Sequence, residues 1–112
     1  MPNKNYESGR NFEYRIIRWL IRKGYYVVRS YASKGIFDLV ATPPRSSRLS
    51  RALLIQAKYS RKGKAYIKVE EKIRLGEAAA RYKAHCCTVT NIPRSKRLIW
   101  KLVSPYYYGK HN

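Results

Sequence analysis

Asp38 is the only aspartate in the chain, and its neighbours Phe37 and Leu39 are apolar. The surrounding segment, residues 36–41, has the composition of a buried strand. A carboxylate among apolar neighbours is costly unless a cation, a metal ion or hydrogen bonds compensate its charge. Asp38 is therefore either half of a structural ion pair, with 25 lysines and arginines available as partners, or a functional group.

Two further polar residues lie on the next predicted strand, residues 53–60. Side chains alternate between the two faces of a strand, so Gln56 and Lys58 share one face. If this strand pairs with the preceding one as an antiparallel hairpin, Asp38 lies opposite the Gln56–Lys58 pair. The pattern predicts a polar centre between two otherwise apolar strands.

Glu13 is expected to complete this centre, because it borders the inward face of a predicted helix, residues 8–23. The side-chain oxygens of Glu13, Asp38 and Gln56 are ligands that suit Mg²⁺, with Mn²⁺ as a substitute. The Lys58 ammonium can orient an attacking water or neutralise charge at phosphorus. Together these groups predict metal-dependent phosphodiester hydrolysis.

Apolar periodicity and turn residues predict the elements that position these groups, in the order α-β-β-β-α-β-β. Helices are expected at residues 8–23, which Gly24 ends, and 69–82, and strands at 25–30, 36–41, 53–60, 86–90 and 98–103. This order predicts an α/β fold, with a central mixed sheet of about five strands flanked by helices.

A length of 112 residues fits a single domain, with residues 1–7 and 106–112 expected as flexible tails. No apolar run reaches the roughly 20 residues of a membrane-spanning helix. The N-terminus lacks the apolar stretch of a secretory signal, so a cytoplasmic, nucleoid-associated protein is expected. Cys86 and Cys87 are adjacent on a strand and point to opposite faces, which favours core positions over a disulfide or metal pair.

Charge is the strongest compositional signal, because 25 basic and 6 acidic residues give a formal net charge of +19. Binding to phosphates relieves the self-repulsion of such a chain and releases counterions, so nucleic acid is the leading partner. An anionic membrane surface is the second candidate. It would require a basic amphipathic helix with an exposed apolar face, whereas these basic residues recur through every segment.

Two basic loops flank the strands of the predicted hairpin. They hold Arg45, Arg48 and Arg51, and Arg61, Lys62 and Lys64. We expect both loops to lie beside the metal site and to contact phosphates along a duplex. A merely solvated position is the alternative for each of these residues.

The segments Ile36-Phe37-Asp38 and Ile55-Gln56-Ala57-Lys58 resemble the motif of the PD-(D/E)xK nuclease superfamily. Around them, Gly9-x-x-x-Glu13, residues 23–34 and Asp38-Leu39-Val40-Ala41 look like archaeal Holliday-junction resolvases of the Hjc type. The resemblance runs from about residue 8 to residue 105. It implies a restriction-endonuclease-like fold, dependence on Mg²⁺ and a homodimer that acts on branched double-stranded DNA.

The resemblance also implies residue roles. Glu13 and Asp38 match the metal-binding acids, Lys58 matches the catalytic lysine, and Ser33 matches a serine near the scissile phosphate. Arg29 matches an arginine that contacts the junction. The residues expected to bind DNA are Arg10, Arg29, Lys34, Arg61, Lys62 and Lys64.

Gln56 departs from the family pattern, because the resolvases usually have glutamate at this place. A neutral amide offers a ligand oxygen without a charge, so weaker metal binding is expected. The Gln-x-Lys form also resembles restriction endonucleases of the Mrr type, so an active enzyme is still expected. Glu70 or Glu71 could supply a substitute charge, although the helix dipole ordinarily explains acids in a first helical turn, and we adopt that explanation.

The sequence thus predicts an endonuclease that resolves four-way (Holliday) junctions by paired, metal-dependent hydrolysis. A two-fold homodimer is expected because it delivers two symmetry-related nicks. Branch shape and phosphates should outweigh base sequence in recognition. The alternatives are an Mrr-like endonuclease on duplex DNA and a non-catalytic, basic nucleic-acid-binding relative.

Overall fold

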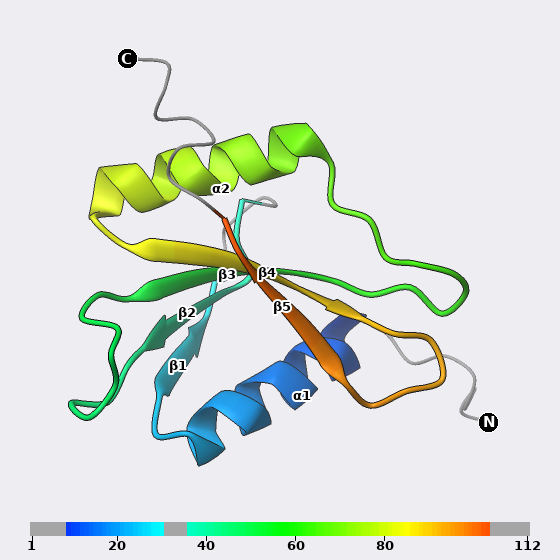
Figure 1. The fold of residues 1–112 in the computed structure, drawn as a ribbon, viewed down its shortest axis with the longest axis horizontal. Coiled ribbons are helices and arrows are strands. Elements are labelled where there is room, and N and C mark those ends of the chain that lie inside the picture. The colour runs from blue at the N-terminus through cyan, green and yellow to red at the C-terminus, as the bar shows by residue number, and fades with distance from the viewer. Residues whose placement is uncertain (1–8, 31–35, 104–112) are drawn as a thin grey trace.

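The described residues, 9–30 and 36–103, form two helices and five strands in the predicted order (Figure 1), as seen in a computed structural model. The helices are α1 (Gly9–Arg22) and α2 (Val69–Tyr82), and the strands are β1 (Tyr26–Arg29), β2 (Leu39–Thr42), β3 (Leu53–Lys58), β4 (His85–Asn91) and β5 (Leu98–Leu102). The expected tails lie outside the described residues. Neither of the two described helices is long and apolar enough to cross a membrane.

The five strands form one mixed sheet in the order β1-β2-β3-β4-β5. Neighbouring strands are antiparallel except for β3 and β4, which are parallel. The connection between that parallel pair contains α2, as a crossover requires. The predicted hairpin of β2 and β3 is confirmed, with Leu39 paired to Ile55.

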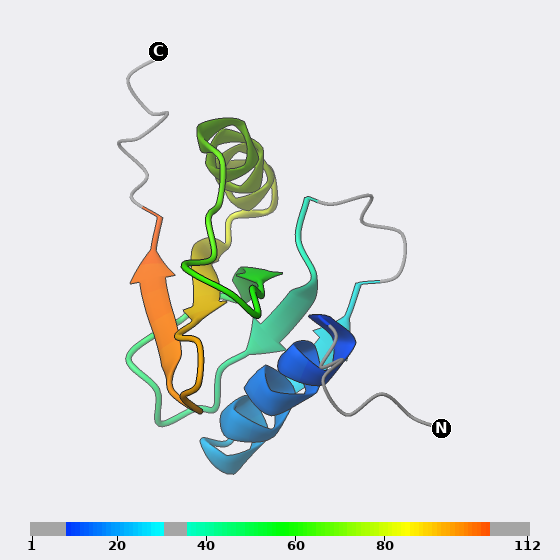
Figure 2. The ribbon, with the colours of Figure 1, turned by 90° about the vertical axis from the view of Figure 1, so that its right-hand side faces the viewer.

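The two helices cover opposite faces of the sheet (Figure 2). Phe12, Ile16 and Leu20 of α1 are buried in one apolar cluster, which Ile55 of β3 also joins. The cluster on the other face contains residues of α2 and β3. Cys86 belongs to this second cluster and Cys87 to the first, so the prediction that they are separate core residues is confirmed.

The end of α1 is fixed by Gly24, as the sequence predicts. Gly24 has a φ of +94°, a backbone conformation that residues other than glycine rarely adopt. The N–H of Tyr25 donates to the Leu20 carbonyl over 3.0 Å, which closes the last turn. A Cβ atom at Gly24 would also lie 3.3 Å from Pro44, so the loop after β2 packs tightly on this turn.

The helix α2 packs on β3 and β4. It does not cover β1 on that face of the sheet. Val27 of β1 packs against the α1 cluster, so its neighbours Tyr26 and Val28 point to the other face. Both are exposed. A surface therefore lies open beside α2, next to the start of β2 and the end of β3.

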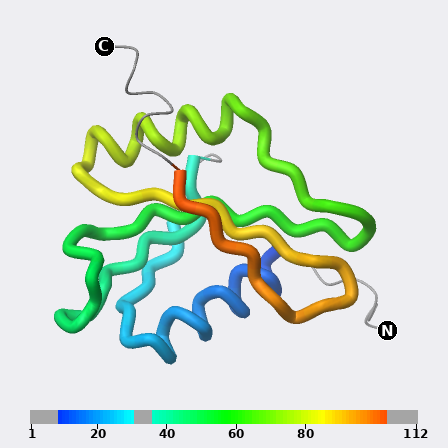
Figure 3. Tube along the Cα trace, in the orientation of Figure 1, coloured from blue at the N-terminus to red at the C-terminus, as the bar shows by residue number. Residues whose placement is uncertain are grey.

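The loops divide between the two ends of the sheet (Figure 3). The segment 59–68, between β3 and α2, the segment 92–97 and the beginning of α1 all lie at one end. The segment 43–52, between β2 and β3, lies at the other end. The expectation that both basic loops flank one site is therefore wrong for Arg45, Arg48 and Arg51, because a hairpin loop lies opposite the free ends of its strands.

Candidate active site

Asp38 lies directly before β2, which begins at Leu39 and not at residue 36 as expected. Its side chain bends toward β3, where its Oδ2 accepts a hydrogen bond from the Ala57 N–H over 2.8 Å. Its own N–H donates to the Ile55 carbonyl over 2.7 Å. Because Leu39 pairs with Ile55, one more step of the antiparallel register puts Asp38 opposite Gln56. The predicted juxtaposition of these two residues is confirmed.

Gln56 is a buried polar residue within the apolar strand β3, with 5% of its surface exposed. Alternation puts it on the same face as Leu54, which belongs to the α2 cluster, and as Lys58. Ala57, between Gln56 and Lys58, binds the Asp38 carboxylate through its backbone. The amide of Gln56 and the ammonium of Lys58 therefore stand on either side of that anchor.

Lys58, the last residue of β3, forms an ion pair with Glu71. The helix dipole alone, which the sequence analysis adopts as the reason for this glutamate, does not predict that pair. The Nζ of Lys58 lies 3.4 Å from Oε2 of Glu71, in the first turn of α2. The other oxygen of Glu71 accepts the Lys68 N–H over 3.0 Å and so caps the helix. Glu71 thus does both: it stabilises the helix start and brings a carboxylate to the polar centre.

Glu13 reaches the centre from α1, and its partner is Arg29 at the end of β1. The Arg29 guanidinium donates to Glu13 Oε1 over 3.2 Å. The guanidinium also lies 5.5 Å from the centre of the Tyr14 ring, a cation–π contact that helps to hold it. The expectation that Glu13 borders the inward face of α1 is confirmed, because its side chain is only 19% exposed.

The two acids predicted to bind metal share an unfavourable electrostatic environment. Burial raises the pKa of Glu13 above its ordinary value, and the charge of Asp38 adds to that rise against the opposing effects of Arg29 and Arg10. Burial likewise raises the pKa of Asp38, while the Ala57 N–H and nearby basic groups oppose it. Each carboxylate is therefore harder to ionise than in water, and a bound cation would relieve this cost.

The carboxylate of Glu71 behaves in the opposite way. Although burial opposes it, the hydrogen bond from the Lys68 N–H and the charge of Lys58 hold the pKa of Glu71 below its ordinary value. The negative charge of Glu71 in turn contributes to the raised pKa of Asp38. Glu71 therefore stays ionised to a lower pH than an ordinary glutamate, in the same electrostatic cluster as Asp38.

The expected DNA-binding residues fall into three groups. Arg10, on the first turn of α1, is exposed and close enough to Glu13 to lower its pKa, and Arg29 pairs with Glu13. Residues 61–64 are exposed in the loop that directly follows Lys58. Ser33 and Lys34 lie outside the described residues.

Asn91 is a site-forming residue that the sequence analysis missed. It is 5% exposed at the end of β4, and its side chain clamps Ser60. The Ser60 N–H donates to Asn91 Oδ1 over 2.9 Å, and Asn91 Nδ2 donates to the Ser60 carbonyl over 2.8 Å. This pair fixes the chain two residues beyond Lys58, where the basic loop begins.

The donor set of the centre fits a hard cation. Asp38 and Glu13 offer carboxylate oxygens and Gln56 offers an amide oxygen, with no sulfur or imidazole among them. Across residues 9–30 and 36–103, no three His, Cys, Asp or Glu side chains gather into a metal-binding group. Two carboxylates with the remaining positions left to water is the arrangement that Mg²⁺ ordinarily takes.

Comparisons with known proteins identify the family and the fold. A family model described as "Archaeal holliday junction resolvase (hjc)" matches residues 4–107. The structure is similar to that of Hjc, a Holliday junction resolvase from the archaeal hyperthermophile Archaeoglobus fulgidus, with a TM-score of 0.69. That match has 23% sequence identity and covers 87% of this chain and 74% of that one, so it shows a shared fold. A search of curated proteins found no match.

Proposed function

The chain belongs to the archaeal Holliday junction resolvase family, and from this membership we propose how its residues cut a four-way DNA junction. Its mixed sheet flanked by two helices is the restriction-endonuclease-like fold that the sequence predicted. One observation carries the proposal for the reaction centre. The Asp38 carboxylate is held by the Ala57 N–H, between Gln56 and Lys58, at an open end of the sheet.

In this proposal, Asp38, Glu13 and the Gln56 amide oxygen hold one Mg²⁺ ion, and Mn²⁺ can replace it. When bound, the ion polarises the scissile phosphate and neutralises its developing charge. The Ala57 N–H keeps the Asp38 carboxylate aimed at the centre. Arg29 does the same for Glu13 through their 3.2 Å contact. Both acids act in the ionised form.

Lys58 is the residue that orients the attacking water or stabilises the charge on the phosphate. Its ammonium donates hydrogen bonds to the attacking water or to a non-bridging phosphate oxygen as the new P–O bond forms and the bond to the leaving oxygen breaks. Glu71 restricts where that ammonium can lie, because its Oε2 forms an ion pair with Lys58 Nζ from the first turn of α2, where the basic loop ends. Glu71 is thus a positioning residue, and it adds a third negative charge near the centre, beside those of Asp38 and Glu13, despite the neutral Gln56.

DNA is bound mainly through its phosphates. Arg10 and Arg29 lie on the α1 side of the centre and residues 61–64 lie beside Lys58, so basic groups border the centre on two sides. The surface left open by α2 gives a duplex access to it. We propose that two copies of the chain act as a homodimer, which would make paired nicks, and that the protein works on nucleoid DNA in the cytoplasm.

The test compares two substrates in the same tube. Equal amounts of a four-way junction and of a linear duplex with the same arm sequences are incubated with the protein and Mg²⁺, and Asp38→Ala serves as the inactive control. The proposal predicts paired nicks in the junction alone. Equal cleavage of both substrates would favour the Mrr-like alternative. No cleavage with either Mg²⁺ or Mn²⁺ would leave the non-catalytic binder.

A further inference from the structure

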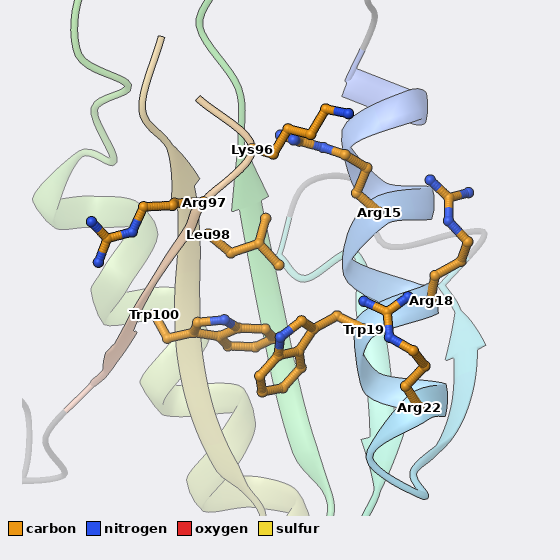
Figure 4. A pocket seen from close by; sticks show the side chains of 8 residues that line it. All are labelled: Arg15, Arg18, Trp19, Arg22, Lys96, Arg97, Leu98 and Trp100. Carbon is orange, nitrogen blue, oxygen red and sulfur yellow. The ribbon is translucent and has the colours of Figure 1, made fainter. Parts of the chain in front are cut away.

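A cleft between α1 and β5, away from the proposed metal residues, is lined by an unusual set of side chains (Figure 4). Its volume is about 460 Å³, within the range of sites that hold small organic ligands. Five basic residues line it: Arg15, Arg18 and Arg22 from α1, and Lys96 and Arg97 from the segment before β5. No acidic residue is among the lining side chains.

The centre of this cleft is aromatic. Trp19 of α1 and Trp100 of β5 lie with their rings 4.9 Å apart at 38°. Figure 4 shows the arginines of α1 on one side of the pair, Lys96 extending toward Arg15, and Arg97 directed away from the rings. These are the only two tryptophans in the chain. Both are partly exposed and line the cleft while they pack against the α1 cluster, and the Lys23 ammonium lies 5.2 Å from the centre of the Trp19 ring.

The combination of cations and aromatic rings selects among polyanions. A duplex hides its base faces, so it can use only the cations, and the Asp and Glu side chains of an acidic polypeptide carry no flat ring. A single strand presents phosphates and an unpaired base together, which matches arginines around an aromatic pair. Branched DNA is a source of such strands wherever pairing fails at the branch.

We propose that the α1–β5 cleft is a second nucleic-acid-binding site, which holds a single-stranded DNA segment with a base against the Trp19–Trp100 pair and phosphates on the surrounding arginines. The stripe of arginines on α1 is then part of a binding surface rather than a solvated helix face. The catalytic centre is not required for this binding, so the proposal does not depend on cleavage.

The tryptophan pair makes the site directly observable, because all tryptophan fluorescence of the protein arises in this cleft. The protein carrying Asp38→Asn is titrated with an oligothymidylate in the presence of a chelator, so that no cutting occurs. The proposal predicts saturable quenching of the tryptophan emission. A DNA duplex of the same length as the oligothymidylate should quench the emission at least about tenfold less effectively, and so should a polyglutamate of similar charge, since neither offers an accessible base.

Two charge-matched double variants separate this cleft from the general charge of the protein. Arg18→Glu with Arg22→Glu changes exposed residues of the cleft, and Arg74→Glu with Arg81→Glu changes exposed residues of α2 on the other face of the sheet. Each pair also removes one basic residue from a last helical turn. The Arg18→Glu, Arg22→Glu variant should bind oligothymidylate about tenfold more weakly, and the number of counterions released on binding, measured from the salt dependence of the affinity, should fall by about two. The Arg74→Glu, Arg81→Glu variant should change the affinity and the salt dependence far less.

Several outcomes would overturn the proposal: no quenching, equal quenching by duplex or polyglutamate, or equal losses in the two double variants. Thermal unfolding of both variants checks that they are folded. A protein that cuts junctions but shows no quenching would refute the cleft alone. A protein that is quenched as predicted but cuts nothing would refute the proposed catalysis alone.

Discussion

Lys58 Nζ and Glu71 Oε2 lie 3.4 Å apart, although the ten residues of the basic loop, 59–68, separate the strand that ends at Lys58 from the helix that holds Glu71 in its first turn. The ion pair closes that loop at its base. It also places a carboxylate beside Lys58 without placing one on β3. The neutral Gln56 therefore does not leave the centre with only two negative charges.

Glu71→Gln removes the charge but keeps an oxygen that can accept the Lys68 N–H. The ion pair is partly exposed, so the free energy of unfolding should fall by less than about 1 kcal/mol. The kcat should fall about tenfold or more with little change in KM, because Lys58 loses its position. The acid limb of the pH–rate profile should move to lower pH, since the charge of Glu71 helps to raise the pKa of Asp38. Glu70→Gln, on the exposed side of the same turn, is the matched control.

Gln56→Glu restores the residue that the resolvases usually have. A second buried carboxylate opposite Asp38 should lower the melting temperature in the presence of a chelator, because two desolvated negative charges repel each other. Added Mg²⁺ should recover that loss, and half-maximal cleavage should need roughly tenfold less Mg²⁺. Unchanged metal dependence of both the melting temperature and cleavage would remove Gln56 from the metal site.

Asp38→Asn should separate catalysis from binding and from stability. Cleavage should fall by at least about 100-fold, since a ligand should matter no less than its outer-shell partners, while junction affinity stays the same or rises. The pKa of Asp38 is raised by folding, so its ionised form costs stability at every pH above that pKa. In the absence of Mg²⁺ the variant should therefore be more stable than the wild type at neutral pH. This advantage should disappear as the pH falls below the ordinary range of aspartate, which urea unfolding can measure.

Arg29→Gln should shift the pH dependence of cleavage. Glu13 must be ionised to act, and burial already raises its pKa, so cleavage is lost as the pH falls through that raised value. The Arg29 hydrogen bond and charge oppose the rise, and their removal raises the pKa of Glu13 further. The acid limb of kcat/KM should therefore move to higher pH. A uniform loss at every pH would show that Arg29 only binds DNA.

Asn91→Ala removes both hydrogen bonds to Ser60 and leaves two backbone groups of that residue without their partner. The free energy of unfolding should fall by about 1–3 kcal/mol, the usual cost of unpaired buried groups. Junction affinity should fall and its salt dependence should weaken, because the basic loop loses its anchor. Asn91→Asp keeps one acceptor for the Ser60 N–H but buries a charge that faces the Ser60 carbonyl, so at neutral pH it should be no more stable than Asn91→Ala.

Much of the fold follows from local pattern. The helix α2 has the predicted bounds, and Gly24 ends the first helix region as its φ requires. The start of β2 was predicted three residues too early, because apolar composition does not show that Asp38 turns its side chain toward the Ala57 N–H. The placement of Asp38 opposite Gln56 was predictable because alternation and a hairpin leave few other registers.

The missed features depend on contacts between distant parts of the chain. A first-turn glutamate satisfies the helix dipole wherever the helix lies, so the sequence alone did not reveal that Glu71 reaches Lys58. Asn91 precedes Ile-Pro and looks like a turn residue, although its side chain forms two hydrogen bonds with Ser60, which follows the neighbouring strand β3. Trp19 and Trp100 meet only because α1 covers the sheet beside β5.

The proposed centre takes Glu13 from α1, Asp38 from the start of β2, Lys58 from the end of β3 and Glu71 from α2. No short fragment of the chain contains all four, and both faces of the sheet contribute. The positive charge, by contrast, is spread along the entire sequence. A chain that is truncated, cleaved by a protease or partly unfolded would thus lose the proposed reaction centre before it loses the positive charge that attracts phosphates.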